Sequence, residues 1–257
     1  MSRPVIGVLI TRAAQQAAPL ADAFSAYGAR VYLLPAIESI PRNLEPHHPA
    51  HDHSSAFDWI IFVSANAVRF GVYLCNSQPQ AQTIAIGPAT SAALKQAGVP
   101  SPLMPSAGFD SEALLKMPAL THIKGARILM VKGVGGRALL GHALRERGAH
   151  VTVADVYERQ CAQPTPHVVA SIEDHWQRGD ISVVTVTSGD VLRCLHDILS
   201  PTGRHHLSQS PLLVGSARIG ALAREQGLQG PLIIATRPDD VGLVAALNAW
   251  TAKHADG

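Results

Sequence analysis

The chain has 257 residues, and at about 150 residues per domain this length predicts two small domains. Apolar residues form 47% of the sequence and charged residues 16%, which supports folded cores and excludes a disordered chain. A formal net charge of +2 and an aromatic content of 5% do not fit the basic stripe and stacking platforms of nucleic-acid binders. We therefore expect no nucleic-acid partner.

No apolar run reaches the roughly 18 residues that a membrane-spanning helix needs, so no membrane partner is expected. The first residues lead directly into a strand pattern, without the apolar region of a signal peptide. The three scattered cysteines, Cys75, Cys161 and Cys194, exclude a disulfide framework and a CxxC metal site. Together these features predict a protein of the reducing cytoplasm.

Short apolar runs alternate with helical patterns along the whole chain. The first strand is expected at Val5–Ile10, and the helix after it ends before Gly28. Later strands are expected at Val31–Leu34, Trp59–Val63, Thr83–Ile86, Arg127–Val131, His150–Ala154, Ser182–Val186, Pro211–Val214 and Leu232–Ala235. Strands that are apolar throughout are typical of parallel sheets covered on both faces. The pattern predicts an α/β fold with doubly wound parallel sheets.

The two halves of the sequence resemble each other. Residues 8–38 align with residues 128–158 without a gap, so that Arg12 meets Lys132. Further matches pair Val63-Ser64 with Thr187-Ser188, Ile86–Thr90 with Val214–Arg218, and Phe109–Ser111 with Pro238–Asp240. Matches in the same order indicate two copies of one α/β unit, and the repeat alone suggests halves of 1–122 and 123–257.

Two polar stretches, 41–56 and 200–210, interrupt this pattern and are predicted to be surface loops. The first contains His47, His48, His51 and His53, which raises the question of a metal site. These histidines have no fixed helical spacing and Pro49 interrupts them, so a solvated loop without metal is the favoured interpretation.

Small and polar residues follow the predicted strands in both halves, where ligands bind in open α/β sheets. Most of them open a helix, and helix N-termini bind anions such as carboxylates. The binding candidates are Thr11, Arg12, Ser64, Asn66, Thr90, Gly135, Arg137, Thr187, Ser188, Gly189 and Ser216. Two such rims facing one cleft suit a large ligand with many acidic groups. The alternative for each single residue is that it only caps a helix.

The segment Gly133-x-Gly135-x-x-Ala138 also fits the relaxed dinucleotide-binding pattern, and Glu158 follows Ala138 by twenty residues. Against a nucleotide, the preceding strand ends in Lys132, and the equivalent segment of the first repeat copy has no glycines. No Gly-x-Ser-x-Gly elbow is present.

Tyr157 stands at the end of a predicted strand, near the expected domain junction. A phenol there can donate a proton or a hydrogen bond to a leaving oxygen. The alternative is a half-buried structural tyrosine.

Several segments occur in a characteristic order: Thr11-Arg12, Phe57–Val68, Ala85–Thr90, Phe109–Leu115, Gly133–Arg137, Val156–Arg159, Thr187–Gly189 and Val214–Ile219. In their number, order and spacing they resemble the uroporphyrinogen-III synthase family, from about residue 5 to residue 247. Each segment alone is unspecific.

The resemblance implies a lyase of tetrapyrrole biosynthesis that closes the linear tetrapyrrole hydroxymethylbilane to uroporphyrinogen III, with inversion of ring D and loss of water. It implies a substrate with eight carboxylates, a reaction without metal or organic cofactor, and catalysis largely by orientation. It also implies a monomer that makes transient contact with the synthase preceding it.

Carried over to this sequence, the family's candidate acid matches Tyr157, and its cleft residues match Ser64, Thr90, Ser188 and Ser216. Arg12, Lys132 and Arg137 stand where carboxylates of the substrate would be met. Lys132 departs from the arginine of many relatives, which weakens bidentate binding of a carboxylate.

The family exchanges its N-terminal segments between the two halves. The resemblance thus implies two flavodoxin-like domains, residues 1–36 plus 161–257 and residues 40–157. Linkers near 36–40 and 157–162 would form a two-stranded hinge beside the ligand cleft. A non-catalytic, two-lobed tetrapyrrole sensor with the same cleft remains the alternative function.

Overall fold

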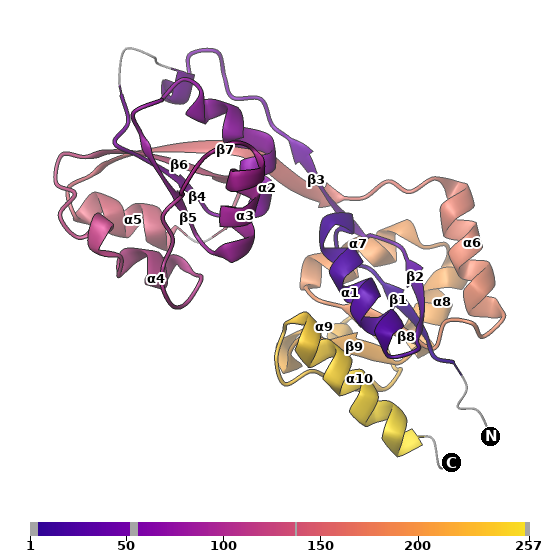
Figure 1. The fold of residues 1–257 in the computed structure, drawn as a ribbon. Coiled ribbons are helices and arrows are strands. Elements are labelled where there is room, and N and C mark those ends of the chain that lie inside the picture. The colour runs from indigo at the N-terminus through magenta and orange to yellow at the C-terminus, as the bar shows by residue number, and fades with distance from the viewer. Residues whose placement is uncertain (1–4, 52–55, 137, 255–257) are drawn as a thin grey trace. The chain divides into compact units, whose positions relative to one another are not determined.

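A computed structural model describes residues 5–51, 56–136 and 138–254 (Figure 1). The chain divides into two compact units: Met1–Glu38 with Gln160–Gly257 form unit 1, and Ser39–Arg159 form unit 2. The N-terminal segment therefore belongs with the C-terminal part of the chain, and not with the residues that directly follow it.

Unit 1 is built on a five-stranded sheet with the order β10-β9-β8-β1-β2. Its strands are β1 (Gly7–Ile10), β2 (Arg30–Leu33), β8 (Val183–Val186), β9 (Leu212–Val214) and β10 (Leu232–Ile234), and all neighbours pair in parallel. The inner strand β1 is fully buried, because Leu9 packs on one face of the sheet while Val8 and Ile10 pack on the other. The strands therefore need helices on both faces.

Two helices cover the face of Val8 and Ile10, namely α1 (Ala14–Ala26) and α10 (Asp240–His254). The opposite face is covered by α6 (Pro166–Gln177), α7 (Gly189–Ile198), α8 (Pro201–Gln209) and α9 (Ala217–Glu225). Each fully buried leucine or isoleucine in these two layers contributes about 1.5–3 kcal/mol to the free energy of unfolding.

Unit 2 has a second five-stranded sheet with the order β3-β7-β6-β4-β5. Its strands are β3 (Ile37–Pro41), β4 (Trp59–Phe62), β5 (Gln82–Ala85), β6 (Arg127–Gly133) and β7 (His150–Cys161). One face is covered by α2 (Ala65–Gly71) and α3 (Pro88–Gln96), the other by α4 (Ser111–Leu115) and α5 (Leu139–Glu146). Short 3-10 turns lie at Pro49–His51, Val72–Cys75 and Pro118–Leu120.

Strands β3 and β7 carry the chain between the two units. Ala162 N–H donates to Ala36 O, and Arg42 N–H donates to Val156 O, so β3 runs antiparallel to β7. The segments expected as linkers are therefore largely paired strand. The sequence prediction missed β3 and ended β7 at Ala154, because the polar residues that follow lack the apolar pattern of a buried strand.

The topology explains the internal repeat. Strands β1 and β2 of unit 1 correspond in the repeat to β6 and β7 of unit 2. In unit 1 this pair lies next to β8 and β9, and in unit 2 it lies next to β4 and β5. The partner of β10 in unit 2 is reduced to one parallel bridge between Ile84 and Leu103. Each unit is thus one copy of the repeat, and the halves 1–122 and 123–257 suggested by the repeat alone are wrong because unit 1 takes its first two strands from the N-terminus.

Two other expectations need correction. Residues 200–210 are mostly helix α8, because Ser200 caps the helix through a bond from Gly203 N–H to its Oγ (3.2 Å) and Leu207 is buried. Two of the three cysteines also pair, as a disulfide joins Cys161 at the end of β7 to Cys194 in α7. Their distance in sequence hid this pair.

Among the described residues, no helix is both long and apolar enough to cross a membrane.

Candidate active site

A pocket of about 530 Å³ lies in unit 2 at the carboxyl ends of its central strands. Four residues selected from the sequence line it: Ser64, Lys132, Gly135 and Tyr157. Ser64 follows β4, Lys132 and Gly135 belong to β6 and the turn after it, and Tyr157 lies in β7. Three strands therefore contribute to the pocket, which is a product of the sheet topology and not of one local motif.

Tyr157 is buried, with 5% of its surface exposed, yet its side chain lines the pocket. Its ring is stacked with that of Phe70 in α2 at a centroid distance of 5.7 Å. The other neighbour is Gly133, where an added Cβ would lie 2.5 Å from Tyr157 Cζ. The phenol is therefore held in a fixed position between α2 and β6.

Ser64 is the N-cap of α2, and its Oγ accepts the N–H of Ala67 at 2.9 Å. The same Oγ lies 3.2 Å from the hydroxyl of Tyr157. Because a serine hydroxyl has one hydrogen and two lone pairs, Ser64 can accept from Ala67 and still donate to Tyr157. In that orientation the phenolic hydrogen is free for a ligand.

The glycine-rich turn after β6 forms another wall of the pocket. Gly135 and Gly136 have φ angles of +78° and +81°, a backbone conformation that residues with a Cβ rarely adopt. Val134 N–H donates to Tyr157 O at 2.8 Å and fixes the turn to β7. Arg137, the next candidate, lies outside the described residues.

Lys132 is not a free cation. Its Nζ lies 3.0 Å from Oδ1 of Asp155, which is its direct partner across the β6–β7 pair. The side chain of Lys132 is 16% exposed, so this ion pair is partly shielded from water. A substrate carboxylate at Lys132 would have to compete with Asp155.

The lining residues that the sequence did not select as site residues include Phe109, Asp110 and Arg159. Asp110 is the N-cap of α4 and accepts the N–H of Ala113 at 2.8 Å. In the sequence, Phe109 and Asp110 stand out as a repeat match and as part of the Phe109–Leu115 segment, and Arg159 as part of the Val156–Arg159 segment. The sequence signal that could have found Phe109 is the repeat alignment, because the aligned residue in the other copy is Pro238 and not an aromatic residue.

Two further candidates of unit 2 are not lining residues of this pocket. Asn66 donates from Nδ2 to Ser39 Oγ at 3.0 Å, so its amide is bonded to β3. Thr90 lies in the first turn of α3 and is 3% exposed.

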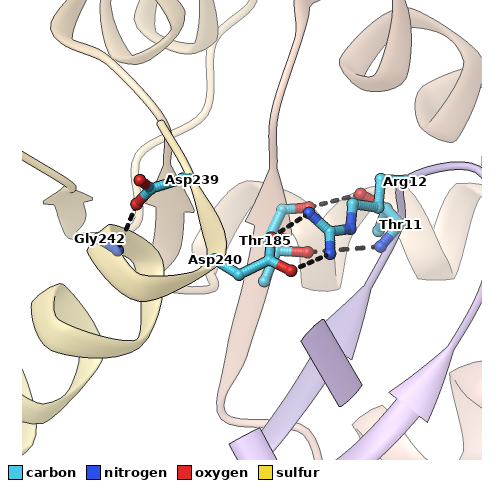
Figure 2. A network of polar contacts seen from close by, with 6 residues as sticks. All are labelled: Thr11, Arg12, Thr185, Asp239, Asp240 and Gly242. Atoms are coloured by element: carbon cyan, nitrogen blue, oxygen red, sulfur yellow. Dashed lines mark hydrogen bonds and ion pairs between the residues drawn. The ribbon is translucent and has the colours of Figure 1, made fainter. Parts of the chain in front are cut away.

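In unit 1 the corresponding rim is occupied by its own polar network (Figure 2). Thr11 is fully buried, and its hydroxyl donates to the carbonyl oxygen of Thr185. Thr11 N–H also points to Thr185 Oγ1 at 3.4 Å. Thr11 therefore joins β1 to β8, contrary to the prediction that it contacts a ligand.

Arg12 is likewise already paired (Figure 2). Its Nη1 and Nη2 lie 2.6 and 3.0 Å from the two carboxylate oxygens of Asp240, the first residue of α10. The Arg12 side chain is 11% exposed, and its Nε has no hydrogen-bond partner among the described residues. The free cation expected from the sequence is thus a bidentate ion pair that attaches α10 to the sheet.

The remaining candidates of unit 1 follow β8 and β9. Ser188 caps α7 by accepting Val191 N–H at 3.1 Å, whereas Ser216 caps α9 without a side-chain hydrogen bond. Gly189 permits close helix packing, because a Cβ there would lie 2.6 Å from Leu222 Cδ2. Thr187 is half-buried beside them.

The histidine-rich segment does not gather metal ligands within the described part of the chain, and neither does any other group of three His, Cys, Asp or Glu there. Both ring nitrogens of His48 are engaged, since Nδ1 accepts Ala50 N–H (3.1 Å) and Nε2 donates to Val153 O (2.9 Å). His53 lies outside the described residues.

Comparison with known proteins gives one consistent result. The family described as uroporphyrinogen-III synthase HemD matches residues 18–245. A uroporphyrinogen-III synthase of Escherichia coli is 32% identical over 251 residues, covering 94% of this chain and all of that protein. The enzyme of Salmonella typhimurium is 38% identical over 138 residues, which is 53% of this chain and 54% of that protein.

Solved structures agree at the level of the fold. The uroporphyrinogen-III synthetase of Helicobacter pylori aligns with a TM-score of 0.60 at 14% identity, covering 96% of this chain and all of that one. A mutant enzyme of Thermus thermophilus gives a TM-score of 0.52 at 18% identity, with 98% of both chains covered.

Proposed function

The chain belongs to the uroporphyrinogen-III synthase family, so its activity is the closure of hydroxymethylbilane to uroporphyrinogen III, and we propose that this closure takes place at the pocket of Tyr157. The observation that carries the proposal is the 3.2 Å contact between the Tyr157 hydroxyl and Ser64 Oγ within that pocket. A phenol held by Ser64 among the lining residues of this pocket supports Tyr157 as the group that meets the substrate.

In the proposed mechanism Tyr157 donates its proton to the hydroxyl group that leaves the linear substrate. The carbon–oxygen bond breaks, water departs, and the electron pair of the adjacent pyrrole stabilises the cationic carbon. The cationic carbon then bonds to the α carbon of ring D that already carries the bridge from ring C, which gives a spiro intermediate. The bond from this bridge to that α carbon breaks, the bridge carbon bonds to the free α carbon of ring D, and one proton is released from there to restore the phenol. General acid catalysis of this kind contributes about 10²- to 10⁴-fold to a rate.

Ser64 supports this step by donating its own hydrogen to the Tyr157 oxygen. The lone pair of Ser64 Oγ that faces the helix is already used by Ala67 N–H, which fixes the hydroxyl in place. A donor at the phenol oxygen stabilises the negative charge that develops there as the proton leaves. Ser64 therefore acts as a positioning residue in this proposal.

We further propose that both units are flavodoxin-like domains and that β3 and β7 form a two-stranded hinge. Unit 1 supports this with the strand order β2-β1-β8-β9-β10, which is the flavodoxin order 2-1-3-4-5. We also propose that Thr187, Ser188 and Ser216 in unit 1 and the backbone at Gly135 in unit 2 bind carboxylates of the substrate. We also propose that the chain acts as a monomer and receives its substrate from the preceding synthase.

The test of the proposed function is isomer analysis. Hydroxymethylbilane is generated by its synthase with and without this protein, and the products are oxidised and separated. Without the protein, the substrate closes without inversion to the type I isomer. Type III product in its presence is the expected result, and type I alone from folded protein contradicts the assigned activity.

A further inference from the structure

Phe109 occupies an unusual position at the pocket. It lines the pocket while 55% of its surface is exposed, although phenylalanine is among the residue types that are most often buried. The ring lies against the backbone of Gly87, where an added Cβ would come within 2.9 Å of Phe109 Cβ and 3.1 Å of Cγ. The lack of a side chain at Gly87 thus lets the Phe109 ring pack against the backbone there, while the rest of the ring is exposed to a ligand.

Arg159 is the second unassigned feature of the pocket. It is exposed and lies two residues beyond Tyr157 on β7, so both side chains are on the same face of the strand. Within the described residues its guanidinium makes no ion pair or hydrogen bond, whereas the other described cation of the pocket, Lys132, is paired with Asp155. Among the described lining residues, Arg159 is therefore the cation that has no ion-pair partner.

The internal repeat provides a comparison within the same chain. Lys132 corresponds to Arg12, and each is paired with an aspartate, so this basic position is neutralised in both copies. In the repeat, Phe109 corresponds to Pro238 and Gly87 corresponds to Gly215. A Cβ added at Gly215 would lie 3.6 Å from Pro238, which is an ordinary van der Waals contact. Extending the alignment by one residue pairs Arg159 with Ser39. Neither the aromatic ring of Phe109 nor the guanidinium of Arg159 therefore has a counterpart of the same chemistry at the matching repeat position.

We propose that Phe109 and Arg159 form a subsite for one pyrrole ring of the substrate. Phe109 contacts the face of the pyrrole, and Arg159 binds a carboxylate on the edge of the same ring. This inference rests on the proposed function, because eight carboxylates on four rings place two on every pyrrole. Aromatic pairs favour ring contacts at 4.5–7 Å, and a guanidinium matches a carboxylate with two parallel hydrogen bonds.

In this proposal the subsite binds the substrate, whereas Tyr157 transfers the proton. Tyr157 and Arg159 share one face of β7, so a pyrrole held by Arg159 lies beside the phenol. Losing the subsite should therefore weaken substrate binding more than it slows proton transfer. A residue with a merely structural role would not produce this split between KM and kcat.

The experiment compares Arg159→Gln and Phe109→Ala with matched controls in the same unit. Lys95→Gln removes an exposed cation from α3, and Tyr73→Ala removes an aromatic ring that is 45% exposed. We expect KM for hydroxymethylbilane to rise about tenfold in Arg159→Gln and about fivefold in Phe109→Ala. The kcat values should change less than threefold, and the controls should match the unsubstituted protein. Phe109→Tyr should restore most of the binding.

A binding measurement keeps this inference separate from the proposed function. The probe is a linear bilane with the same carboxylate side chains but without the leaving hydroxyl, and its dissociation constant is measured by calorimetry. If the unsubstituted protein makes type III product but Arg159→Gln and Phe109→Ala bind the bilane like the controls, the subsite is wrong and the function stands. If Arg159→Gln weakens binding of the bilane but the unsubstituted protein forms no type III product, the subsite stands and the proposed function is wrong.

Discussion

The ring of Tyr157 lies directly on Gly133, with Tyr157 Cζ only 2.5 Å from the point where a Cβ on residue 133 would stand. The two residues are partners across the β6–β7 pair, at the place where the register between these strands shifts. The absence of a side chain at residue 133 therefore determines where the phenol can lie, and with it the contact to Ser64.

We predict that Gly133→Ala lowers kcat by about 10- to 100-fold, because the Tyr157 ring must move by an ångström or more and a shift of that size misaligns a catalytic group. The measurement is the rate of type III product formation. Gly215→Ala is the matched control, since Gly215 directly follows β9 as Gly133 ends β6, but its added Cβ would lie 3.6 Å from the nearest atom of Pro238. Equal losses of kcat in both variants would show that the contact between Gly133 and the Tyr157 ring is unimportant for catalysis.

Tyr157→Phe removes the phenolic hydroxyl and keeps the ring packed between Phe70 and Gly133. We predict a loss of about 10²-fold or more in kcat with a nearly unchanged dissociation constant for a linear bilane, because the proton donor is lost and the shape is not. Tyr73→Phe, at an exposed tyrosine outside the pocket, controls for loss of a hydroxyl. Equal weakening of catalysis and of binding would exclude a role as acid.

Local signals in the sequence were sufficient for the apolar strands and for some helix caps, but not for β3, the end of β7 or helix α8. Ser64 and Ser188 each follow an apolar run and each cap the next helix, as the pattern indicates. The partners of Thr11 and Arg12 lie 174 and 228 residues away, so no local pattern could show that both are engaged. An unpaired cation such as Arg159 is defined by the absence of neighbours, which only the folded chain reveals.

The ion pair between Arg12 and Asp240 makes a testable contribution to stability. Asp240→Asn leaves the mostly buried guanidinium of Arg12 without its counter-charge, and we predict a loss of about 2 kcal/mol in the free energy of unfolding. Urea denaturation measures this loss. Asp174→Asn removes an exposed helical partner of Arg178 and should cost less than about 0.5 kcal/mol. Similar losses in the two variants would contradict a special role for the buried pair.

The disulfide between Cys161 and Cys194 should stabilise unit 1 by constraining the unfolded chain, since it closes a loop across a sequence separation of 33 residues. We predict that reduction lowers the free energy of unfolding by about 3 kcal/mol. Urea denaturation with and without dithiothreitol measures this change, and a Cys161→Ser, Cys194→Ala double variant should not respond to the reductant.

Thiol labelling decides whether the disulfide forms at all. Burial raises the pKa of the remaining thiol, Cys75, to about 11, so only about one molecule in a thousand carries the reactive thiolate at pH 8. In the folded protein Cys75 should therefore react slowly with an alkylating reagent. After unfolding in urea without reductant, one thiol per chain should be labelled, because Cys161 and Cys194 stay joined through the unfolding step. Three labelled thiols would contradict the disulfide and remove the reason for the predicted stability difference.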